Sequence, residues 1–584
     1  MLSLTGARWT VREVDRRRAQ ELAQAAGLSF AAASVLSLRW EEGTSPDQWL
    51  TPSIDQLHDP LAMRNMGEAL ERLRRAVARR ERIRVVTDYD VDGTTSSLIL
   101  QAALRCLDPS VDVTYHIPSR FDEGYGFSVR AAQQAAADGV SLIVTADIGV
   151  RDHAAIAAAR EAGLDVLVCD HHLPAGAAVP EDATVLCPPQ VGDTYPNRAL
   201  AACGVSLKVA QALVKGHKSE GPIVRSMLKL AAIGTVADMV SLGTSENRAI
   251  VALGLAELNR GPHHAGLQAL LDVCRLDPGA IDEVALGFRI GPRINAAGRL
   301  ADAGMVVELL GLRDPAIAGE KARQLDALNT ARRDLQRQIV AEAIDHVGES
   351  PAPFVVVSGH EAAGWHRGVV GIVASRLKDH AHRPVAVVSI QGELAVGSVR
   401  SIPGVHAVAA LESVSDLLLK FGGHPMAAGF TVRAADLPAL AARLAQFVTA
   451  TVPAGELVPT RRADVVVAAE DLTERLHAEL LRLGPFGSGN PQPALILPGV
   501  RPFAVQVKSF GAKGEGAAAN EGTLLKFLVG RGGARAIAGV WWGAGAMAEP
   551  LQQGPVDLLV HLSENHWNGE RTLQLDVRDA RPAQ

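Results

Sequence analysis

Three aspartates occupy alternate positions of one short segment, Asp88-Tyr89-Asp90-Val91-Asp92-Gly93. Carboxylates this close together repel one another unless a cation lies between them. No Lys or Arg occurs between Arg84 and Arg105 to supply that charge locally. The segment therefore favours a bound metal ion, with an acidic surface turn as the alternative.

The same D-x-D-x-D-G spacing opens the calcium loop of an EF-hand, which we exclude here. That loop requires a glutamate at its twelfth position, where this chain has Ile99. It also requires a helix before the loop, whereas residues 83–87 (Ile-Arg-Val-Val-Thr) predict a buried strand.

Two more acidic segments follow later predicted strands. Asp147 follows the strand-like stretch 141–146, and Asp170-His171-His172 follows the stretch 164–169. Taken alone, Asp147 would be a helix N-cap and the histidines a surface pair. Their recurrence at successive strand ends favours a shared metal centre. Carboxylates mixed with imidazole suit Mn²⁺ or Mg²⁺.

Asp238 is a fifth acidic candidate. It lies between apolar residues in the segment Gly-Thr-Val-Ala-Asp-Met-Val at 234–240. Burying an unpaired carboxylate is costly, and a metal ion would remove that cost. The alternative is an ordinary helix end.

The elements that must position these residues alternate between strand and helix. Predicted helices at 94–106, 128–138 and 151–162 separate predicted strands at 83–87, 111–117, 141–146 and 164–169. Such alternation implies an α/β fold, a parallel sheet with helices on both faces. Ligands of such sheets bind beyond the carboxyl ends of the strands, where the acidic residues lie.

The rest of the chain divides into three further regions. Residues 204–310 are mostly helical, and 315–347 predict a long helix that connects domains. Residues 352–450 show a second α/β pattern, with strands near 354–358 and 384–390 and a Gly-rich turn at 422–423. Beyond 455, Gly-rich turns and short strands predict a small β-barrel, with strands at 503–510, 523–529, 535–541, 556–562 and 571–577.

Composition restricts the class of protein. A chain of 584 residues suggests about four domains of roughly 150 residues each. With 48% apolar and 21% charged residues, the chain is not a disordered one. No apolar run reaches the roughly 18 residues of a membrane helix, and the first residues lack a signal-peptide core. Five cysteines without CxxC pairs fit a reducing compartment, so we expect a cytoplasmic protein.

Together, these segments resemble the motifs of the DHH phosphoesterase superfamily. The four motifs correspond to Asp88–Gly93, Asp147, Asp170–His172 and Gly234–Asp238. Gly422–Phe430 resembles the glycine-rich motif of the associated DHHA1 domain. Two further segments, Arg293–Arg299 and Trp365–Gly371, resemble those of the RecJ family of single-stranded-DNA-specific exonucleases. The resemblance covers nearly the whole chain, from about residue 50 to the end.

The resemblance implies a phosphodiesterase with two Mn²⁺ or Mg²⁺ ions. The implied ligands are Asp90 and Asp147 for one ion, and Asp92, Asp147, His171 and Asp238 for the other. Asp147 would bridge the ions, and Asp88 would complete or support the first site. Asp170 would orient His171, and His172 would face the scissile phosphate.

The resemblance also implies substrate contacts in two other regions. In a Gly-containing loop, arginines suited to forked phosphate contacts flank an asparagine, as Arg293, Asn295 and Arg299. A structural salt bridge is the alternative for either arginine alone. In the DHHA1-like region, the implied phosphate contacts are Arg400, Ser401, Gly422, Gly423 and His424.

The region after 455 resembles the family's oligonucleotide-binding (OB) barrel. Its basic residues outnumber the acidic ones between 501 and 535, with Arg501, Lys508, Lys513, Lys526, Arg531 and Arg535 against Glu515 and Glu521. That excess could follow a phosphate backbone, and ordinary solvated strands are the alternative. Trp541, Trp542 and Trp567 could stack on bases or pack in a core.

We therefore expect a 5′→3′ exonuclease that hydrolyses single-stranded DNA to mononucleotides in DNA repair and recombination. The family implies single-strand-binding protein and a RecQ-type helicase as partners. The alternatives are a DHH phosphodiesterase acting on short oligonucleotides or cyclic dinucleotides, and a non-catalytic DNA-binding scaffold. The expected domains are an N-terminal extension (1–50), a DHH domain (51–314), a connector helix (315–347), a DHHA1 domain (348–450) and an OB-like domain (455–584).

Overall fold

The computed structural model describes residues 2–41, 43–174, 176, 178–348, 350–510, 522–532 and 534–583. The described chain forms two compact units. The first holds Arg39–Asn329 and the later segment Leu481–Gln492. The second holds the residues up to Leu38, Thr330–Leu480 and the residues from Pro493 onward. Each unit is therefore built from segments that lie far apart in the sequence.

The centre of the first unit is a five-stranded parallel sheet with the order β3-β2-β4-β5-β6. Its strands are β2 (Ile83–Thr87), β3 (Val113–His116), β4 (Leu142–Ala146), β5 (Asp165–Cys169) and β6 (Thr184–Leu186). Thr87 pairs with Ala146, and Ala146 pairs with Cys169. The last residues of β2, β4 and β5 therefore lie side by side, and the predicted α/β fold is confirmed.

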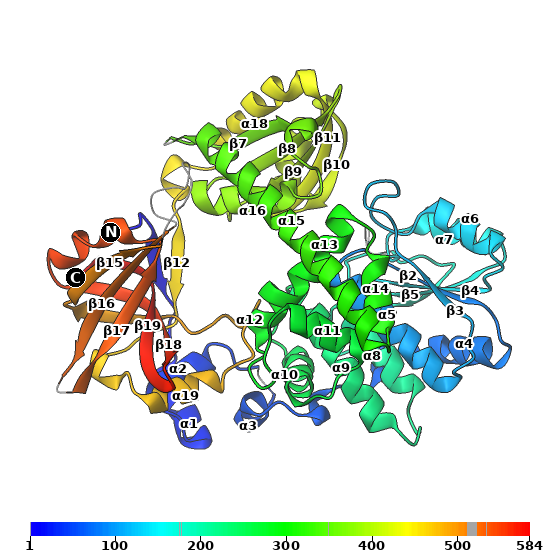
Figure 1. Ribbon diagram of the computed structural model, residues 1–584, viewed down its shortest axis with the longest axis horizontal. Helices are drawn as coiled ribbons and strands as arrows, with labels where there is room; N and C mark the ends of the chain where they lie inside the picture. Colours follow the sequence, from blue (N-terminus) through cyan, green and yellow to red (C-terminus); the bar gives the residue numbers. More distant parts are fainter. Residues whose placement is uncertain are drawn as a thin grey trace. The chain divides into compact units, whose positions relative to one another are not determined.

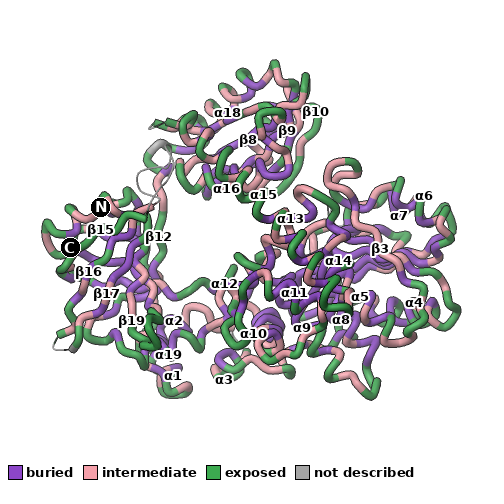
Figure 2. The backbone as a smooth tube through the Cα atoms, in the orientation of Figure 1, coloured by how far each residue is buried: buried purple, intermediate pink, exposed green. Residues whose placement is uncertain are grey.

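Helices cover both faces of this sheet because its side chains alternate between two cores. In β4, Leu142 and Val144 pack in one core, and Ile143 packs in the other. The surrounding helices are α4 (Met66–Ala78), α5 (Val91–Leu107), α6 (Val129–Ala137), α7 (His153–Glu161) and α8 (Ala202–Leu213). Figure 1 shows α4 and α6 on opposite faces, and Figure 2 shows the buried strands between them.

The remainder of the first unit is mostly helical, as predicted for residues 204–310. It contains α3 (Pro46–Leu50), α9 (Glu220–Ala237), α10 (Ser245–Arg260), α11 (Ala265–Val273), α12 (Glu283–Ala285), a π-helical turn (Leu286–Ile290), α13 (Gly291–Leu300) and α14 (Gly304–Gly311). The predicted long helix is α15 (Pro315–Val347), which begins in the first unit and ends in the second. Among the described residues, every helix is too short or too polar to cross a membrane.

The second unit contains the other predicted α/β region. Its sheet has the order β10-β11-β9-β8-β7. The strands are β7 (Val355–His360), β8 (Val385–Gln391), β9 (Leu394–Arg400), β10 (Leu418–His424) and β11 (Ala427–Arg433). The helices are α16 (Val370–Ala381), α17 (Ala407–Glu412) and α18 (Leu437–Thr451).

The C-terminal region forms a seven-stranded sheet with the order β13-β14-β18-β19-β17-β16-β15. Its strands are β13 (Val465–Val466), β14 (Leu495–Val500), β15 (Phe503–Ser509), β16 (Thr523–Arg531), β17 (Ala534–Trp542), β18 (Val556–Trp567) and β19 (Glu570–Pro582). The end strands β13 and β15 do not pair with each other in the described chain. The region predicted as a barrel is therefore an OB-like sheet, and its two end strands are not seen to close it into a barrel in the described chain.

The N-terminal residues belong to this same unit. Strand β1 (Arg8–Val11) pairs in parallel with β12 (Thr460–Ala463). The indole of Trp9 donates a hydrogen bond to Asp579 in β19, at 2.8 Å. Helices α1 (Arg16–Ala26), α2 (Phe30–Ser37) and α19 (Glu474–Leu481) complete the α-helices of the described chain.

Candidate metal centre

The acidic residues predicted from the sequence gather at one edge of the parallel sheet. Asp88, Asp147 and Asp170 directly follow the paired last residues of β2, β4 and β5. Asp238 joins them from the end of α9. The side chains form three sets, and within each set the ligand atoms lie no more than 4.8 Å apart. The sets are Asp88 with Asp90 and Asp147, Asp92 with His171 and Asp238, and Asp147 with His171 and His172.

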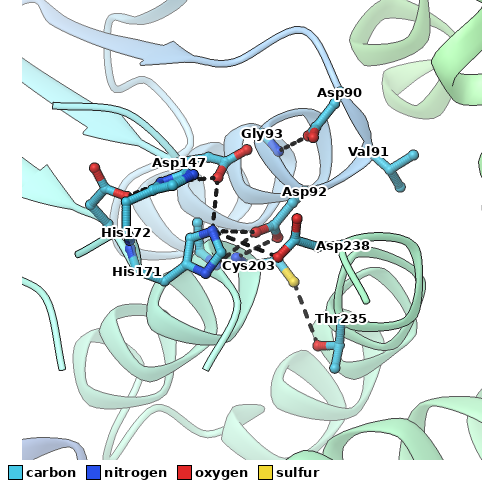
Figure 3. Close-up of polar contacts among 12 residues, drawn as sticks. Asp90, Val91, Asp92, Gly93, Asp147, His171, His172, Cys203, Thr235 and Asp238 are labelled. Atoms are coloured by element: carbon cyan, nitrogen blue, oxygen red, sulfur yellow. Dashed lines mark hydrogen bonds and ion pairs between the residues drawn. The ribbon is translucent and has the colours of Figure 1, made fainter. Parts of the chain in front are cut away.

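His171 lies at the centre of this cluster (Figure 3). Its Nε2 atom is 3.2 Å from Oδ1 of Asp147, 3.6 Å from Oδ2 of Asp238 and 3.9 Å from Oδ2 of Asp92. Burial lowers the pKa of His171, so the ring is neutral and keeps a lone pair for a ligand. Its buried Nε2 has no hydrogen-bond partner within the described residues.

The carboxylates of the cluster cannot all carry charge without a counter-ion. Burial, and then repulsion between the aspartates, raises the pKa of Asp88 and Asp147 well above the usual range. The same causes raise the pKa of Asp238 to about 9. Oδ1 of Asp88 is buried and finds no hydrogen-bond partner in the described chain. Oxygen ligands with imidazole suit Mn²⁺ or Mg²⁺, so the residues fit such an ion.

Asp92 is held by the first residues of α8. Its Oδ2 accepts a hydrogen bond from the backbone N–H of Ala202 at 2.7 Å, and its Oδ1 accepts one from Cys203 at 2.8 Å. The alternative of an acidic surface turn is wrong, because Asp92 is only 1% exposed. The exclusion of an EF-hand is confirmed, because strand β2 precedes the segment. Sequence reasoning missed the α8 contacts. The sequence feature that could have indicated them is the run of small residues at the start of α8, Ala201-Ala202-Cys203-Gly204.

The backbone accommodates this crowding at two positions. Asp147 has a φ of 65°, a left-handed conformation that is strained for a residue with a side chain and is concentrated at functional sites. A Cβ atom on Gly234 would lie 2.5 Å from Sγ of Cys203 and 3.0 Å from Oδ1 of Asp92. Glycine at this position lets α9 approach the ligands closely.

Asp170 contacts the ring of His172 but only the backbone N–H of His171, so the expectation that it orients the ring of His171 was wrong. Its Oδ1 accepts backbone N–H bonds from both histidines and lies 2.8 Å from Nδ1 of His172. The carboxylate caps this turn, which brings only the second ring within its reach. Burial opposes the charge of Asp170, but the hydrogen bond from His172 helps to hold its pKa below the usual range. An ionised carboxylate only accepts hydrogen bonds, so Nδ1 of His172 carries a proton.

Tyr125 is a candidate that sequence reasoning missed. Its hydroxyl lies 3.2 Å from Nε2 of His172 and 3.3 Å from the backbone carbonyl oxygen of Asp147. It comes from the connection between β3 and α6, where Gly124 and Gly126 both have positive φ. No motif marked this connection. The glycines on either side of an aromatic residue were its only signal.

The segment predicted as a Gly-containing loop is helix α13, so that prediction was wrong. Gly298 serves close packing, because a Cβ there would lie 2.6 Å from the carbonyl oxygen of Tyr89. Nε of Arg293 lies 2.8 Å from Oδ1 of Asp326, which is the salt bridge given as the alternative for this arginine. The other predicted contacts on α13 are half-buried: Asn295 and Arg299.

In the second unit, predicted polar residues gather at one end of the β10-β11-β9 ladder. Arg400 pairs with Ala427, which pairs with His424. Nη1 of Arg400 donates to Oγ of Ser398 at 3.0 Å. A Cβ atom on Gly371 would lie 3.1 Å from Nη2 of Arg400, so the first turn of α16 packs against this arginine.

Ser401 and the glycine pair have structural constraints of their own. Ser401 is 1% exposed, and its hydroxyl donates to the carbonyl oxygen of Val405 at 2.6 Å. Gly422 and Gly423 lie within strand β10, so the predicted Gly-rich turn was wrong. A Cβ on Gly423 would lie 2.5 Å from Cα of Ala428, so the β10–β11 pairing itself requires glycine there.

The predicted nucleic-acid contacts of the C-terminal sheet differ in how far they are exposed to solvent. Trp541 is buried, whereas Trp542 and Trp567 are 63% and 72% exposed. Phe510 stacks on Trp542 with ring centroids 5.8 Å apart. The predicted basic residues that are exposed are Arg501, Lys508, Lys526 and Arg535, while Arg531 is half-buried. Lys513, Glu515 and Glu521 lie outside the described residues.

Comparisons with known proteins match most of the chain. Family models match three ranges: the DHH family N-terminal domain at 82–235, the DHHA1 domain at 352–450 and the RecJ OB domain at 463–579. The single-stranded-DNA-specific exonuclease RecJ of Bacillus subtilis (strain 168) is 35% identical over 580 residues, covering 98% of this chain and 70% of that protein. RecJ of Dickeya dadantii (strain 3937) is 34% identical over 573 residues, covering 93% and 95%. The crystal structure of RecJ in complex with Mn²⁺ from Thermus thermophilus matches with a TM-score of 0.83 at 30% identity, covering 100% of this chain and 80% of that one.

Proposed function

Because the chain belongs to the RecJ family of single-stranded-DNA-specific exonucleases, we propose that it is a metal-dependent exonuclease that hydrolyses single-stranded DNA from the 5′ end to mononucleotides. The observation that carries this proposal is the acidic cluster, whose members are buried or half-buried and in which Asp147 belongs to two of the three ligand sets. Mn²⁺ and Mg²⁺ are the expected ions, because carboxylate and imidazole ligands suit both.

The proposed ligands divide between two ions. One proposed set is Asp90 and Asp147 with Asp88, which lie together in the structure. The other adds Asp147 to the group of Asp92, His171 and Asp238, since Oδ1 of Asp147 lies 3.2 Å from Nε2 of His171. When bound, such a pair of ions supplies Lewis acidity that activates water and stabilises the leaving oxygen. Asp147 contributes to both sets, and its strained backbone fixes the direction of its carboxylate. The N–H groups at the start of α8 keep Asp92 in place.

His172 is assigned to the scissile phosphate. Burial lowers its pKa, but the hydrogen bond with Asp170 outweighs burial and leaves the pKa of His172 raised. The ring therefore holds a proton at Nε2 at a higher pH than a free histidine does. Tyr125, 3.2 Å from Nε2, orients this edge of the ring. A protonated Nε2 can donate to a phosphate oxygen, a charge-assisted hydrogen bond.

Recognition of the 5′ end is assigned to the polar end of the sheet in the second unit. A terminal phosphate carries more charge than an internal one. Arg400 suits forked phosphate contacts, and His424 adds a donor beside it. The first turn of α16 packs there and offers backbone N–H groups. The other proposed contacts are Ser401, Gly422, Gly423, Arg293, Asn295 and Arg299.

Two observations favour this function over its alternatives. The OB-like sheet with exposed Trp542 and Trp567 favours long single strands over short oligonucleotides or cyclic dinucleotides. The complete set of ligand residues, each buried or half-buried, opposes a non-catalytic scaffold. Within this proposal, the enzyme acts in DNA repair and recombination with single-strand-binding protein and a RecQ-type helicase. Its five free cysteines fit a cytoplasmic location.

One assay tests the proposal. Single- and double-stranded DNA and RNA, labelled at either the 5′ or the 3′ end, are incubated with Mn²⁺, Mg²⁺ or EDTA. We expect rapid release of a labelled mononucleotide only from 5′-labelled single-stranded DNA with metal. Cleavage that persists in EDTA would reject the metal centre, and early release of a 3′ label would reverse the polarity.

A further inference from the structure

The segment Leu481–Gln492 is part of the first unit although the chain on both sides of it belongs to the second. It also lies inside the range that matches the RecJ OB domain, 463–579. We call its central residues, Leu483–Asn490, the strap. A piece of the C-terminal region is therefore packed in the unit that holds the metal centre.

The strap is held in one conformation by hydrogen bonds from Arg248, which lies on α10, and from its own residue Asn490. Arg248, which is fully buried, donates to the carbonyl oxygen of Leu483 at 3.1 Å and to that of Gly484 at 2.8 Å. Asn490, also fully buried, donates to the carbonyl oxygens of Leu483 and Pro485 at 2.9 and 2.8 Å. Buried side chains that satisfy backbone groups in this way make a rigid element.

The strap contacts the loop that carries Asp238. This loop joins α9 to α10, and the backbone N–H of Leu242 donates to the carbonyl oxygen of Ser488 at 2.7 Å. Gly489 has a φ of 72°, and a Cβ there would overlap Oγ of Ser241. A Cβ on Gly487 would lie 2.9 Å from Cδ1 of Leu242. The fit leaves no room for even one methyl group.

The opposite side of the loop is held by α10. Nδ2 of Asn247 donates to the carbonyl oxygen of Ser241 at 2.9 Å. Ser241 and Leu242, three and four residues beyond Asp238, are thus clamped between the strap and Asn247. Met239, next to Asp238, has a φ of 59° and is 72% exposed, so it contributes little packing to hold the ligand.

We infer that the strap is a positioning element for Asp238 and so sets the affinity of the metal centre. This inference rests on the proposed function, because it takes Asp238 as a metal ligand. Groups that orient ligands typically control metal affinity by about 10- to 100-fold. The strap does so through its contacts with Ser241 and Leu242, and none of its residues belongs to the described ligand sets.

The test is Gly489→Ala in the full chain, with Gly279→Ala as the matched control. Gly279 lies in the same unit with a φ of 87°, and a Cβ there would have no atom within 4 Å. Both variants place alanine in a left-handed conformation, so both carry the same backbone strain. Only Gly489→Ala pushes on the Asp238 loop.

The measurements are Mn²⁺ affinity by titration calorimetry and the Mn²⁺ concentration needed for cleavage of single-stranded DNA. We expect Gly489→Ala to weaken Mn²⁺ binding by about tenfold or more, with cleavage restored at high Mn²⁺. Gly279→Ala should bind Mn²⁺ as the wild type does. Adding Ser241→Ala to Gly489→Ala removes the overlapped hydroxyl and should recover affinity.

Several results would overturn the inference. They are wild-type Mn²⁺ affinity in folded Gly489→Ala, equal weakening in Gly279→Ala, or no recovery with Ser241→Ala. If Gly489→Ala does not fold, Gly487→Ala is the milder variant, because its methyl meets only the end of the Leu242 side chain. It must then weaken Mn²⁺ binding. A wild-type chain that binds no Mn²⁺ would instead reject the proposed function.

Discussion

The two polar sites of this chain differ in how their charges are compensated. In the first unit, Asp88 is buried and His171 is half-buried, and each has a buried ligand atom without a hydrogen-bond partner in the described chain. In the second unit, Arg400 is half-buried and donates to Ser398 and to the carbonyl oxygen of Val399. Unpaired buried groups require a ligand, whereas a solvated, hydrogen-bonded arginine is stable without one. The metal centre therefore follows from electrostatics, while the end-recognition site depends on the family relationship.

The most severe test of this contrast is Asp147→Ala. The remaining ligands cannot hold two cations close together, so several kcal/mol of transition-state stabilisation and about 10³-fold in cleavage rate should be lost. Cleavage of 5′-labelled single strands in Mn²⁺ measures the effect. Asp165→Ala, at the opposite end of β5 and paired with Arg72, should keep its activity. Near-normal cleavage by Asp147→Ala would disprove the two-metal assignment.

Removing the metal should make stability depend on pH. The raised pKa values of Asp88, Asp147 and Asp238 mean that the metal-free folded state binds more protons than the unfolded state. Its stability should fall as pH rises from about 4 towards 9, since the folded state must then give up protons that the unfolded chain has already lost.

Mn²⁺ should reverse this loss. Binding to the folded state alone adds about 2.7 kcal/mol at a concentration of 100 Kd. The rise in melting temperature with Mn²⁺ should be larger at pH 8 than at pH 6, because the ligands must be deprotonated. Thermal melts with Mn²⁺ and with EDTA at both pH values measure it. An equal rise at the two pH values would show that the cluster does not titrate as described.

Asp170→Asn should act through His172. Without the carboxylate, the pKa of His172 should fall, because the hydrogen bond that raises it is weakened. The alkaline limb of the pH–rate profile should therefore move to lower pH, with a rate loss of about tenfold at neutral pH. Single-turnover cleavage across pH gives the limb. Tyr125→Phe is the comparison variant and should lower the rate with a smaller shift of the limb. An unmoved limb in Asp170→Asn would exclude His172 as the titrating group.

Arg400→Ala should affect the choice of substrate more than the chemical step. Loss of one charged hydrogen bond of about 1.5 kcal/mol should reduce the preference for 5′-phosphate over 5′-hydroxyl strands by about tenfold. The ratio of single-turnover rates on the two substrates measures this. Arg433→Ala, at the other end of β11, is the control. An unchanged ratio in Arg400→Ala removes this residue from end recognition.

The smallest effects are expected on the OB-like sheet. Trp542→Ala and Trp567→Ala should each weaken binding of long single strands by about 1 kcal/mol, as loss of one stacked base does. Fluorescence anisotropy with long and short oligonucleotides separates this from effects at the metal centre. Buried Trp541 is unsuitable for the same test, because its truncation would destabilise the sheet. Equal loss on long and short strands would argue against a role in holding long DNA.

Local sequence patterns predicted the metal centre because all of its proposed ligands except Asp238 come from segments that directly follow regular strands. Asp147 and Asp170 are adjacent in space because β4 and β5 pair in register, with Ala146 opposite Cys169. The direction of each side chain was not predictable in this way. Asp170 contacts the ring of His172 rather than that of His171, and this depends on the geometry of one turn.

The same local patterns could not predict contacts between segments that lie far apart in the sequence. The N–H groups of α8 that hold Asp92 lie 110 residues further along the chain. Gly298 suggested a loop, although it is needed for a close approach to Tyr89 within a helix. Gly422 and Gly423 suggested a turn, although they lie within a strand where Gly423 is needed for the close approach of Ala428. A glycine signals that space or a special conformation is needed, and only the fold shows which.

The strap has a consequence for how the enzyme is made. During synthesis, domains generally fold in order from the N-terminus. A nascent chain that has emerged through Asn329 contains every proposed metal ligand but lacks Leu483–Asn490. Its Asp238 loop would lack the contact between Leu242 and Ser488. Full nuclease activity would then appear only after the C-terminal region has left the ribosome, so incomplete chains would be weak nucleases.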